Sequence, residues 1–260
     1  KTTFLTVRMI DSENNFAILK DSAKQNSLIA ETIALAKEHD FDGIVLDLEV
    51  SAVPFESLIN QITAFTRRFS QAAKKEQLGF NVTIYGDVFY RIRPFAVKEI
   101  AKQSDEVMIM AYDFSKARGN PGPNFPLKGK EVYGYDMTEM VADFLNVAPA
   151  KKITVVFGLY GYDWKVDPDS VQADEKGIAI AQGKAITYQE IREKFLNTCA
   201  FAECNVRRKN DSAETEIRYT DNEGEKHIIW FEDFESIEKK KALLKQKGIT
   251  SFGFWANGYF

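Results

Sequence analysis

The sequence predicts an α/β fold, a parallel (β/α) barrel that carries a small α+β insertion. Short apolar runs alternate along the chain with longer amphipathic segments, and this alternation is typical of parallel βαβ units. The 260 residues fit one such barrel, because α/β barrels often reach this length as a single domain. Hydrophobic residues make up 45% of the chain, which is enough to bury a large core.

Apolar runs mark the strands, and segments with helical periodicity mark the helices. The expected strands cover residues 4–10, 41–49, 79–85, 107–112, 152–159 and 249–255. The expected helices cover residues 27–39, 55–69, 94–103, 136–145 and 234–247. Asp136 stands three residues before Glu139, which is the spacing of a capping box at a helix start. Gly248 follows the last helix, where glycine commonly ends a helix.

Two stretches do not follow the βα pattern. Residues 114–134 are rich in glycine and proline and predict a long ordered loop. The second stretch predicts an α+β insertion, with a helix over residues 188–198 and a hairpin of residues 216–219 and 227–231. The expected domains are a first part of the barrel (1–163), the insertion (164–230) and a last part of the barrel (231–260).

Composition and spacing argue against several classes of function. The formal net charge of −4 argues against a protein that binds nucleic acid through its phosphates. No apolar run approaches the roughly 20 residues that cross a bilayer, so no membrane span is expected. His39 and His227 are isolated, no cluster has metal-ligand spacing, and no glycine-rich phosphate loop precedes a helix. We therefore expect neither a metal nor another cofactor.

Three smaller features complete the survey of the chain. Cys199 and Cys204 are compatible either with one local disulfide or with free thiols. The lysines at 239–241 lie on an expected helix and predict a solvated face. The chain opens with lysine and runs directly into a strand, so we expect a processed or trimmed piece from which a targeting segment has been removed.

The strand expected over residues 41–49 carries the clearest chemistry. Alternate residues of a strand lie on opposite faces, so Val45, Asp47 and Glu49 share the inner face. The two acids stand at the carboxyl end of the strand, where parallel barrels build their active sites. Charge on one carboxylate disfavours ionisation of the other and so keeps a proton available for a leaving group. The alternative, a pair of solvated acids, is disfavoured by the apolar strand that precedes them.

Five motifs stand in order along the chain. Residues 42–49 look like a DGxDxDxE strand, and residues 110–113 look like an MxYD strand end. Residues 123–127 look like the loop that follows, and residues 158–164 look like a seventh strand that turns into an insertion. Trp255 looks like the tryptophan of a last strand. From about residue 4 to residue 260, the chain therefore resembles glycoside hydrolase family 18, the chitinase-like barrel glycosidases.

The resemblance also implies a branch and a complete barrel. Residues 227–233 and 255–258 are similar to the spore-germination and stabilin-interacting branch, whose bacterial members act on cell-wall glycan. The family fold is a (β/α)8 TIM barrel, and the six expected strands correspond to its strands 3 to 8. Strands 1 and 2 have no counterpart, which would leave two edges unpaired. We therefore expect a missing N-terminal segment, other chains or other elements to close the barrel.

The resemblance implies substrate-assisted, retaining hydrolysis of a β-1,4-linked N-acetylglucosamine polymer, peptidoglycan or chitin-like, without a protein nucleophile. Glu49 would act as general acid/base and protonate the glycosidic oxygen, and the 2-acetamido oxygen of the substrate would attack the anomeric carbon. Asp47 would orient the acetamido group and stabilise the developing positive charge. Tyr112 and Asp113 would hydrogen-bond the acetamide from the opposite side, and Trp255 would stack under the sugar.

Five further residues are candidates for contact with the substrate. Met110 belongs to the MxYD-like strand end, and Tyr160 directly follows the strand at 152–159. Tyr85 and Asp87 lie at the end of the strand at 79–85 and could instead be ordinary strand-end residues. Trp164 could line a glycan groove or pack between insertion and barrel, and Trp230 is expected to pack.

One departure from the family pattern bears on activity. Val45 stands where typical active members have an aspartate that shares a proton with the next acid. Valine cannot share a proton with Asp47, so the Asp47 side chain is expected to stay oriented toward Glu49. Val45 therefore favours one alternative to an enzyme, a glycan-binding lectin. A structural or interaction domain without a role in sugar binding also stays open. The expected partner is an oligo- or polysaccharide that contains N-acetylglucosamine, and the expected location is extracellular or in the cell envelope.

Overall fold

The chain forms two compact units in a computed structural model that describes residues 1–171, 176–256 and 258. The first unit comprises residues 1–110 and 143–154, and the second comprises residues 111–142 and 155–260.

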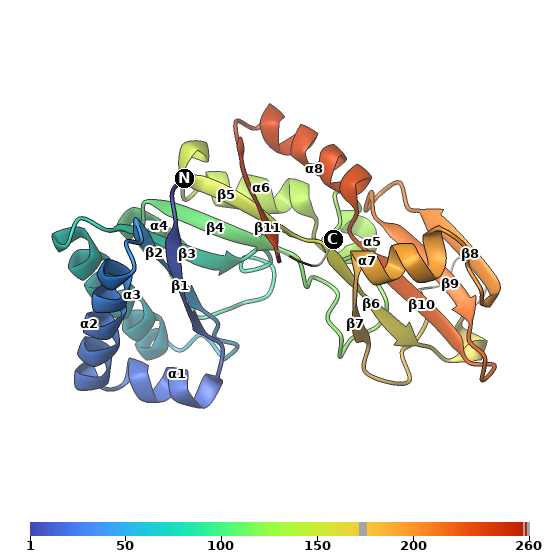
Figure 1. The fold of residues 1–260 in the computed structure, drawn as a ribbon, viewed down its shortest axis with the longest axis horizontal. Coiled ribbons are helices and arrows are strands. Elements are labelled where there is room, and N and C mark those ends of the chain that lie inside the picture. The colour runs from blue at the N-terminus through green and yellow to red at the C-terminus, as the bar shows by residue number, and fades with distance from the viewer. Residues whose placement is uncertain (172–175, 257, 259–260) are drawn as a thin grey trace. The chain divides into compact units, whose positions relative to one another are not determined.

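The first unit is built on a parallel sheet. Its strands pair in sequence order (Figure 1), as expected for βαβ units: β1 (Phe4–Met9), β2 (Gly43–Leu48), β3 (Gly79–Tyr85) and β4 (Glu106–Ala111). Every residue of β2 is buried. Gly43 permits this close packing, because a Cβ there would lie 2.3 Å from the Phe4 ring and 2.6 Å from the carbonyl oxygen of Gly79.

Helices connect these strands: α1 (Ser12–Leu19), α2 (Ser22–Glu38), α3 (Glu56–Lys75) and α4 (Val97–Gln103). Helices α1 to α3, drawn in blue to teal in Figure 1, pack with one another and against β1 and β3. Phe65 and Phe69 of α3 are fully buried, and the ring centroid of Phe69 lies 5.4 Å from that of Phe80 on β3. The sequence did not predict α1, which is capped by Asp11 and buries Asn15.

The second unit contains β11 (Ser251–Trp255) and most of β5 (Ile153–Gly158), and these two strands are neighbours in the sheet. The ring centroid of Phe157 on β5 lies 6.3 Å from that of Phe252 and 6.2 Å from that of Phe254 on β11. The last helix, α8 (Phe234–Gln246), is followed by Gly248 with φ +81°, which confirms the glycine expected there.

Helix α6 (Met137–Leu145) begins at the predicted cap. The Oδ1 atom of Asp136 accepts the backbone N–H groups of Thr138 and Glu139, at 2.9 and 3.1 Å. The Glu139 side chain binds elsewhere and forms an ion pair with Lys130 at 2.7 Å. Lys130 opens the short helix α5 (Lys130–Tyr133), which lies in the stretch predicted as a loop.

An antiparallel sheet in the order β7-β6-β10-β9-β8 makes up most of the rest of the second unit (Figure 1). Its strands are β6 (Tyr160–Lys165), β7 (Lys184–Thr187), β8 (Ala202–Arg208), β9 (Thr215–Thr220) and β10 (Lys226–Phe231). Strands β9 and β10 form the predicted hairpin, in which Ile217 pairs with Ile229. The helix predicted at 188–198 is present as α7 (Tyr188–Ile191) and the π-helix η3 (Arg192–Leu196). Two 3₁₀ turns, η1 (Ala150–Lys152) and η2 (Pro168–Ser170), complete the described elements.

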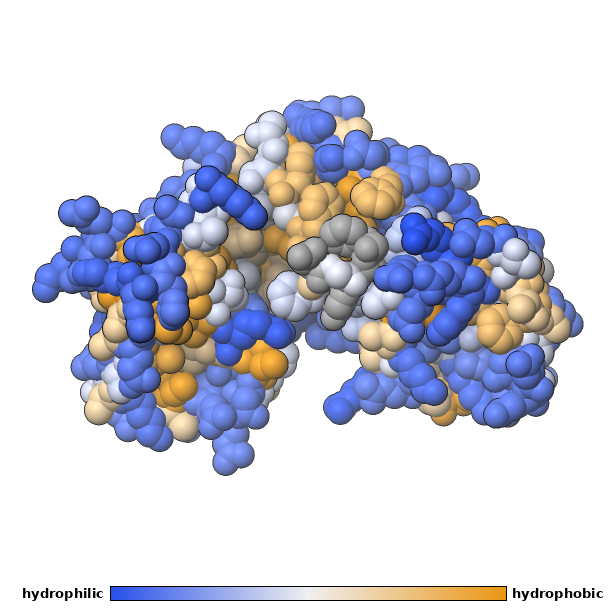
Figure 2. Space-filling model, viewed as in Figure 1, coloured by the Kyte–Doolittle hydropathy of each residue, from blue (hydrophilic) through white to orange (hydrophobic). Residues whose placement is uncertain are grey.

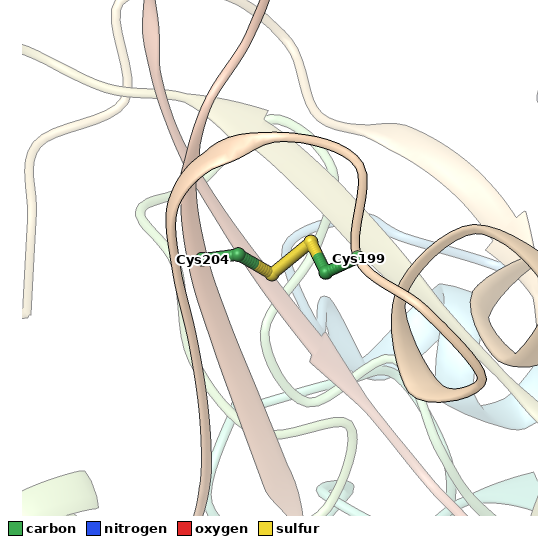
Figure 3. The surroundings of a disulfide bond; sticks show 2 residues. All are labelled: Cys199 and Cys204. Atoms are coloured by element: carbon green, nitrogen blue, oxygen red, sulfur yellow. A yellow bond between two sulfur atoms is a disulfide. The ribbon is translucent and has the colours of Figure 1, made fainter.

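Each face of the antiparallel sheet has its own apolar cluster. One cluster includes Ile191 and Phe195 of the α7–η3 segment with Ile217 and Phe231 of the sheet. The disulfide between Cys199 and Cys204 (Figure 3) lies beside this cluster, so the local bridge is the alternative that the structure contains. The other cluster contains Trp164, Val166, Ile228 and Trp230. Its members confirm that Trp230 packs in the interior.

The surface of the chain is mainly hydrophilic on the face that Figure 2 shows. Among the described residues, no helix is long and apolar enough to cross a membrane. The prediction of a solvated face at 239–241 is wrong for Lys240, whose side chain is fully buried between two glutamates. The proposed boundaries at 163 and 230 stay predictions, and so does the closure of the barrel by elements that take the place of strands 1 and 2.

Candidate active site

Strand β2 places the two predicted acids at its carboxyl end in the first unit. Parallel pairing with β1 sets Asp47 opposite Arg8, and pairing with β3 sets Val45 opposite Asn81. Val45 and Asp47 are both buried, at 6% exposure. The inward position below Asp47 is therefore apolar, as the sequence indicates.

Asp47 has a partner on each neighbouring strand. Its Oδ1 atom accepts a hydrogen bond from the Thr83 hydroxyl of β3 at 2.5 Å. Its Oδ2 atom lies 3.5 Å from Nε of Arg8 on β1. Sequence reasoning missed both partners, although Thr83 stands two residues before Tyr85 on the same face of β3. The expected orientation of Asp47 toward Glu49 stays a prediction.

Glu49 follows β2, and its backbone is fixed on both sides. Its N–H group donates to the carbonyl oxygen of Met9 at 2.9 Å, and its carbonyl oxygen accepts from the side-chain amide of Asn15 at 2.9 Å. Asn15 is 2% exposed and also donates to Met9 at 2.8 Å. Helix α1, which the sequence did not predict, therefore supports the backbone of the proposed acid.

The Glu49 carboxylate also has a phenolic partner. The Tyr85 hydroxyl donates to Oε2 of Glu49 at 3.1 Å. Burial, followed by the charge of Glu49, raises the pKa of Tyr85, so the phenol stays protonated and remains a donor. Met110 pairs with Tyr85 across β3 and β4 and is itself buried, at 7% exposure.

The second unit holds the other predicted carboxylate, Asp113, directly after Tyr112. The backbone of Asp113 is left-handed, with φ +57°, a conformation that aspartate tolerates better than most residues. Its Oδ1 atom accepts the Tyr162 hydroxyl at 2.9 Å and the Tyr160 hydroxyl in a shorter contact. Tyr162 was not among the predicted site residues, although it lies two positions after Tyr160 on the same face of β6.

Aromatic rings surround this carboxylate. The ring centroid of Tyr160 lies 6.2 Å from that of Tyr112 and 5.8 Å from that of Tyr162. Burial first, and then the charge of Asp113, raises the pKa of both Tyr160 and Tyr162. Both phenols therefore donate to Asp113 throughout the neutral pH range. Gly158 makes room for this cluster, because a Cβ there would lie 2.4 Å from the Tyr160 ring.

A buried polar network continues from the backbone of Asp113. Its N–H group donates to Oδ1 of Asn124 at 2.8 Å, and the N–H groups of Asn124 and Phe125 donate to Glu214 at 2.5 and 2.8 Å. Lys240 donates to Glu214 at 2.6 Å and also binds Glu232. Glu214, Glu232 and Lys240 are fully buried. Nothing in their local sequence distinguishes them from solvated charges, so sequence reasoning missed them.

The two predicted tryptophans differ in exposure. Trp255 ends β11, is partly exposed, and accepts the N–H of Leu159 through its carbonyl oxygen at 3.0 Å. Trp164 is 0% exposed, and its indole N–H donates to the carbonyl oxygen of Ala117 at 3.3 Å. A ring without exposed surface cannot stack on a sugar, so this burial favours packing, the alternative considered for Trp164.

No group of three or more His, Cys, Asp or Glu side chains within residues 1–171, 176–256 and 258 is arranged to hold a metal ion. His227 is nevertheless not isolated, because its Nδ1 atom lies 2.9 Å from Oδ1 of Asp163. The absence of a cofactor stays a prediction.

The fold and these residues define a parallel α/β protein with a pair of acids at the end of a buried strand. The model of the family Glycosyl hydrolases family 18 matches residues 9–259. The chain therefore belongs to glycosyl hydrolases family 18, and the resemblance found in its sequence is confirmed.

Curated relatives share about a quarter of their aligned residues with this chain. A cortical fragment-lytic enzyme of Bacillus subtilis (strain 168) is 24% identical over 250 residues, which cover 93% of this chain and 52% of that protein. Di-N-acetylchitobiase of Rattus norvegicus is 26% identical over 250 residues, which cover 88% of this chain and 64% of that protein. The chain thus spans about half to two thirds of the length of these relatives.

Solved structures show the same fold. A class V chitinase from Nicotiana tobaccum matches with a TM-score of 0.84 at 17% identity, over 100% of this chain and 76% of that chain. The Bacillus megaterium QM B1551 spore cortex-lytic enzyme SleL matches with a TM-score of 0.74 at 23% identity, over 95% of this chain and 52% of that chain. These are structures of the TIM-barrel type. Spore enzymes among the relatives and structures support the branch predicted from residues 227–233 and 255–258.

Proposed function

We propose that this chain is a glycosidase that hydrolyses β-1,4-linked glycan containing N-acetylglucosamine, with Glu49 as general acid/base. The arrangement at the end of β2 carries this proposal. Asp47 is buried and bound by Thr83 and Arg8, whereas Glu49 accepts a hydrogen bond from Tyr85. Two neighbouring carboxyl groups with different partners can take different roles in one reaction.

The proposed reaction is substrate-assisted and retains the anomeric configuration. Glu49 gives its proton to the glycosidic oxygen while the bond from that oxygen to the anomeric carbon breaks. The 2-acetamido oxygen of the same sugar forms a new bond to the anomeric carbon and gives a cyclic, positively charged intermediate. Water then attacks the anomeric carbon, its proton passes to the Glu49 carboxylate, and the acetamido oxygen leaves.

Asp47 and Asp113 have separate proposed roles. Asp47 orients the acetamido N–H and stabilises the positive charge that develops on the acetamido group. Tyr112 and Asp113 bind the acetamide, and the phenols of Tyr160 and Tyr162 keep the Asp113 carboxylate oriented. Trp255 stacks under the sugar, since it is partly exposed at the end of β11. Preorganised groups of this kind stabilise a transition state without reorienting during the reaction.

The proposed substrate is an oligo- or polysaccharide such as peptidoglycan or a chitin-like polymer. The names of relatives support this class, because they include a di-N-acetylchitobiase, a class V chitinase and a cortical fragment-lytic enzyme. The disulfide of Cys199 and Cys204 supports an extracellular or envelope location, because such bonds persist mainly in oxidising compartments.

The test is a panel of N-acetylated glycans in which new reducing ends are measured. We expect turnover by the native chain and a loss of about 10²–10⁴-fold in Glu49→Gln, which is the usual contribution of a general acid. Asp47→Asn keeps the shape of the side chain and should also reduce kcat. Turnover that is retained in Glu49→Gln would remove Glu49 from the proposed role.

A lectin is the second candidate function, and Val45 favours it because the usual third acid is replaced by a buried apolar side chain. A lectin would bind the same glycans without cleaving them. Isothermal titration with N-acetylglucosamine oligomers separates the two functions. Binding without new reducing ends, lost in Trp255→Ala, supports the lectin, whereas unchanged binding in Trp255→Ala contradicts it.

A further inference from the structure

A buried arginine lies next to the phenol that binds Glu49 in the first unit. After Tyr85 ends β3, the chain passes Asp87 and returns through Arg93. Arg93 forms three hydrogen bonds with Asp87, from Nε to Oδ1 at 3.1 Å and from one terminal nitrogen to Oδ1 at 2.9 Å and Oδ2 at 3.2 Å. The side chains of both residues are only 6% exposed. The planar guanidinium is therefore fixed in one orientation.

The fixed guanidinium covers the ring of Tyr85. Its central carbon lies 3.8 Å from the ring centroid, which is a close cation–π contact. Phe95 contacts Tyr85 edge-on, with ring centroids 6.1 Å apart. The other terminal nitrogen of Arg93 donates to the Ser51 hydroxyl at 3.2 Å, and Ser51 lies two residues after Glu49. Arg93 thus contacts both the end of β3 and the segment that follows β2.

We propose that Arg93 is a positioning residue for Glu49, which it orients by holding the Tyr85 ring while the Tyr85 hydroxyl donates to Oε2 of Glu49. This inference rests on the proposed function of Glu49. It adds to that function a chain of contacts from Asp87 through Arg93 and Tyr85 to the acid. The sequence indicated Asp87 only as a residue at the end of a strand, and Arg93 belongs to no motif of the sequence.

The chain of contacts has a chemical consequence for the acid. A hydrogen bond from a phenol stabilises a carboxylate more than a carboxylic acid, so it favours release of the proton from Glu49. The negative charge of Asp47 acts in the opposite direction. The other charged groups of the first unit that bear on this region are Arg8 beside Asp47, and Arg91 and Arg93 beside Asp87. Removing the phenol should therefore make Glu49 release its proton at higher pH.

The test uses Tyr85→Phe, Arg93→Met and the double variant, with Arg91→Met as a matched control. Arg91 also binds Asp87, and its guanidinium carbon lies 5.9 Å from the ring centroid of Tyr90. The readout is the ¹³C shift of the Glu49 carboxyl carbon against pH, assigned by its loss in Glu49→Gln. This measurement does not depend on turnover, so it stays informative if the chain proves to be a lectin. The pH profile of kcat/KM follows the same proton wherever cleavage is seen.

We expect the titration midpoint of Glu49 to rise by about 0.5 to 1 pH unit in Tyr85→Phe and by less in Arg93→Met. The Arg93→Met effect should largely disappear in the Tyr85→Phe background, because Arg93 acts through the phenol. Arg91→Met removes a positive charge from the same Asp87 but keeps Arg93, so it should shift the midpoint much less than Arg93→Met. Equal effects of Arg93→Met in both backgrounds, or the same shift in Arg91→Met, would overturn the proposal. If Arg93→Met does not fold, Arg93→Lys replaces it, since Lys keeps the charge but loses the stacked plane.

Discussion

Asp47 of the first unit and Asp113 of the second unit are held in different ways. Asp47 is bound by Thr83 and Arg8, which lie on the strands directly beside β2, and the Arg8 side chain is 46% exposed. Asp113 is bound by two phenols, and its backbone is held by Asn124, which rests on a network without exposure to solvent. The orientation of Asp47 thus follows from the register of one sheet, whereas that of Asp113 depends on residues far along the chain.

The two regions also differ in how charge is balanced. Asp47 faces one cation at the surface, where solvent weakens the interaction. Behind Asp113, the single ammonium of Lys240 lies between the carboxyl groups of Glu214 and Glu232. Burial, reinforced by the charge of Glu214 and opposed by Lys240, raises the pKa of Glu232 to about 8. One of the two carboxyl groups therefore keeps a proton at neutral pH, and the network is electrically balanced.

Lys240→Met should have the largest effect on stability. It leaves two buried carboxyl groups without a cation, and breaking a buried pair in this way costs about 3–5 kcal/mol. Urea denaturation of the full chain measures the free energy of unfolding. Lys239→Met is the matched control, because Lys239 forms an exposed pair with Glu235 that solvent screens, so its loss should change stability far less. If Lys240→Met lowered the free energy of unfolding as little as Lys239→Met does, the buried network would not stabilise the second unit.

Glu232 should give the chain a pH-dependent stability of moderate size. Its folded pKa of about 8 lies above its ordinary value of 4.5, so the folded state holds a proton that the unfolded state has released. The contribution of Glu232 to the free energy of unfolding is fully present below pH 4.5 and is lost as the pH rises through about 8. The unfolding free energy should therefore decrease across this range, and Glu232→Gln should flatten the decrease. Denaturation curves at several pH values test this, and identical slopes in both proteins would contradict it.

Arg8→Met should have the smallest effect on stability. A partly exposed pair at 3.5 Å contributes roughly 0–1 kcal/mol. If Arg8 orients Asp47 for the proposed reaction, the variant should nevertheless lower kcat more than it changes KM. A change in KM alone would show that Arg8 takes part only in binding. A stability loss as large as that of Lys240→Met would remove the contrast between the two aspartates.

The sequence by itself determined the βα framework and the placement of the acids. Apolar runs and period-2 alternation put Asp47 and Glu49 at the end of β2, because strand geometry depends on local residues. Asp136, Gly248 and the β9–β10 hairpin were predictable for the same reason. Helix α1 was missed because one of its two buried residues, Asn15, is polar, and strand β8 was missed because most of its residues are exposed.

The partners of the acids were decided only by the tertiary structure. Lys239, Lys240 and Lys241 are identical residues in sequence, yet only Lys240 points to two buried glutamates. Arg93 likewise becomes a contact of Tyr85 only when the loop after β3 folds back. A charged side chain carries no local signal of its partner, since the pair is selected by burial and by distance in space. The local sequence therefore determined the position of Glu49 at the end of β2, whereas the tertiary structure determined that Tyr85 and Arg93 lie beside it.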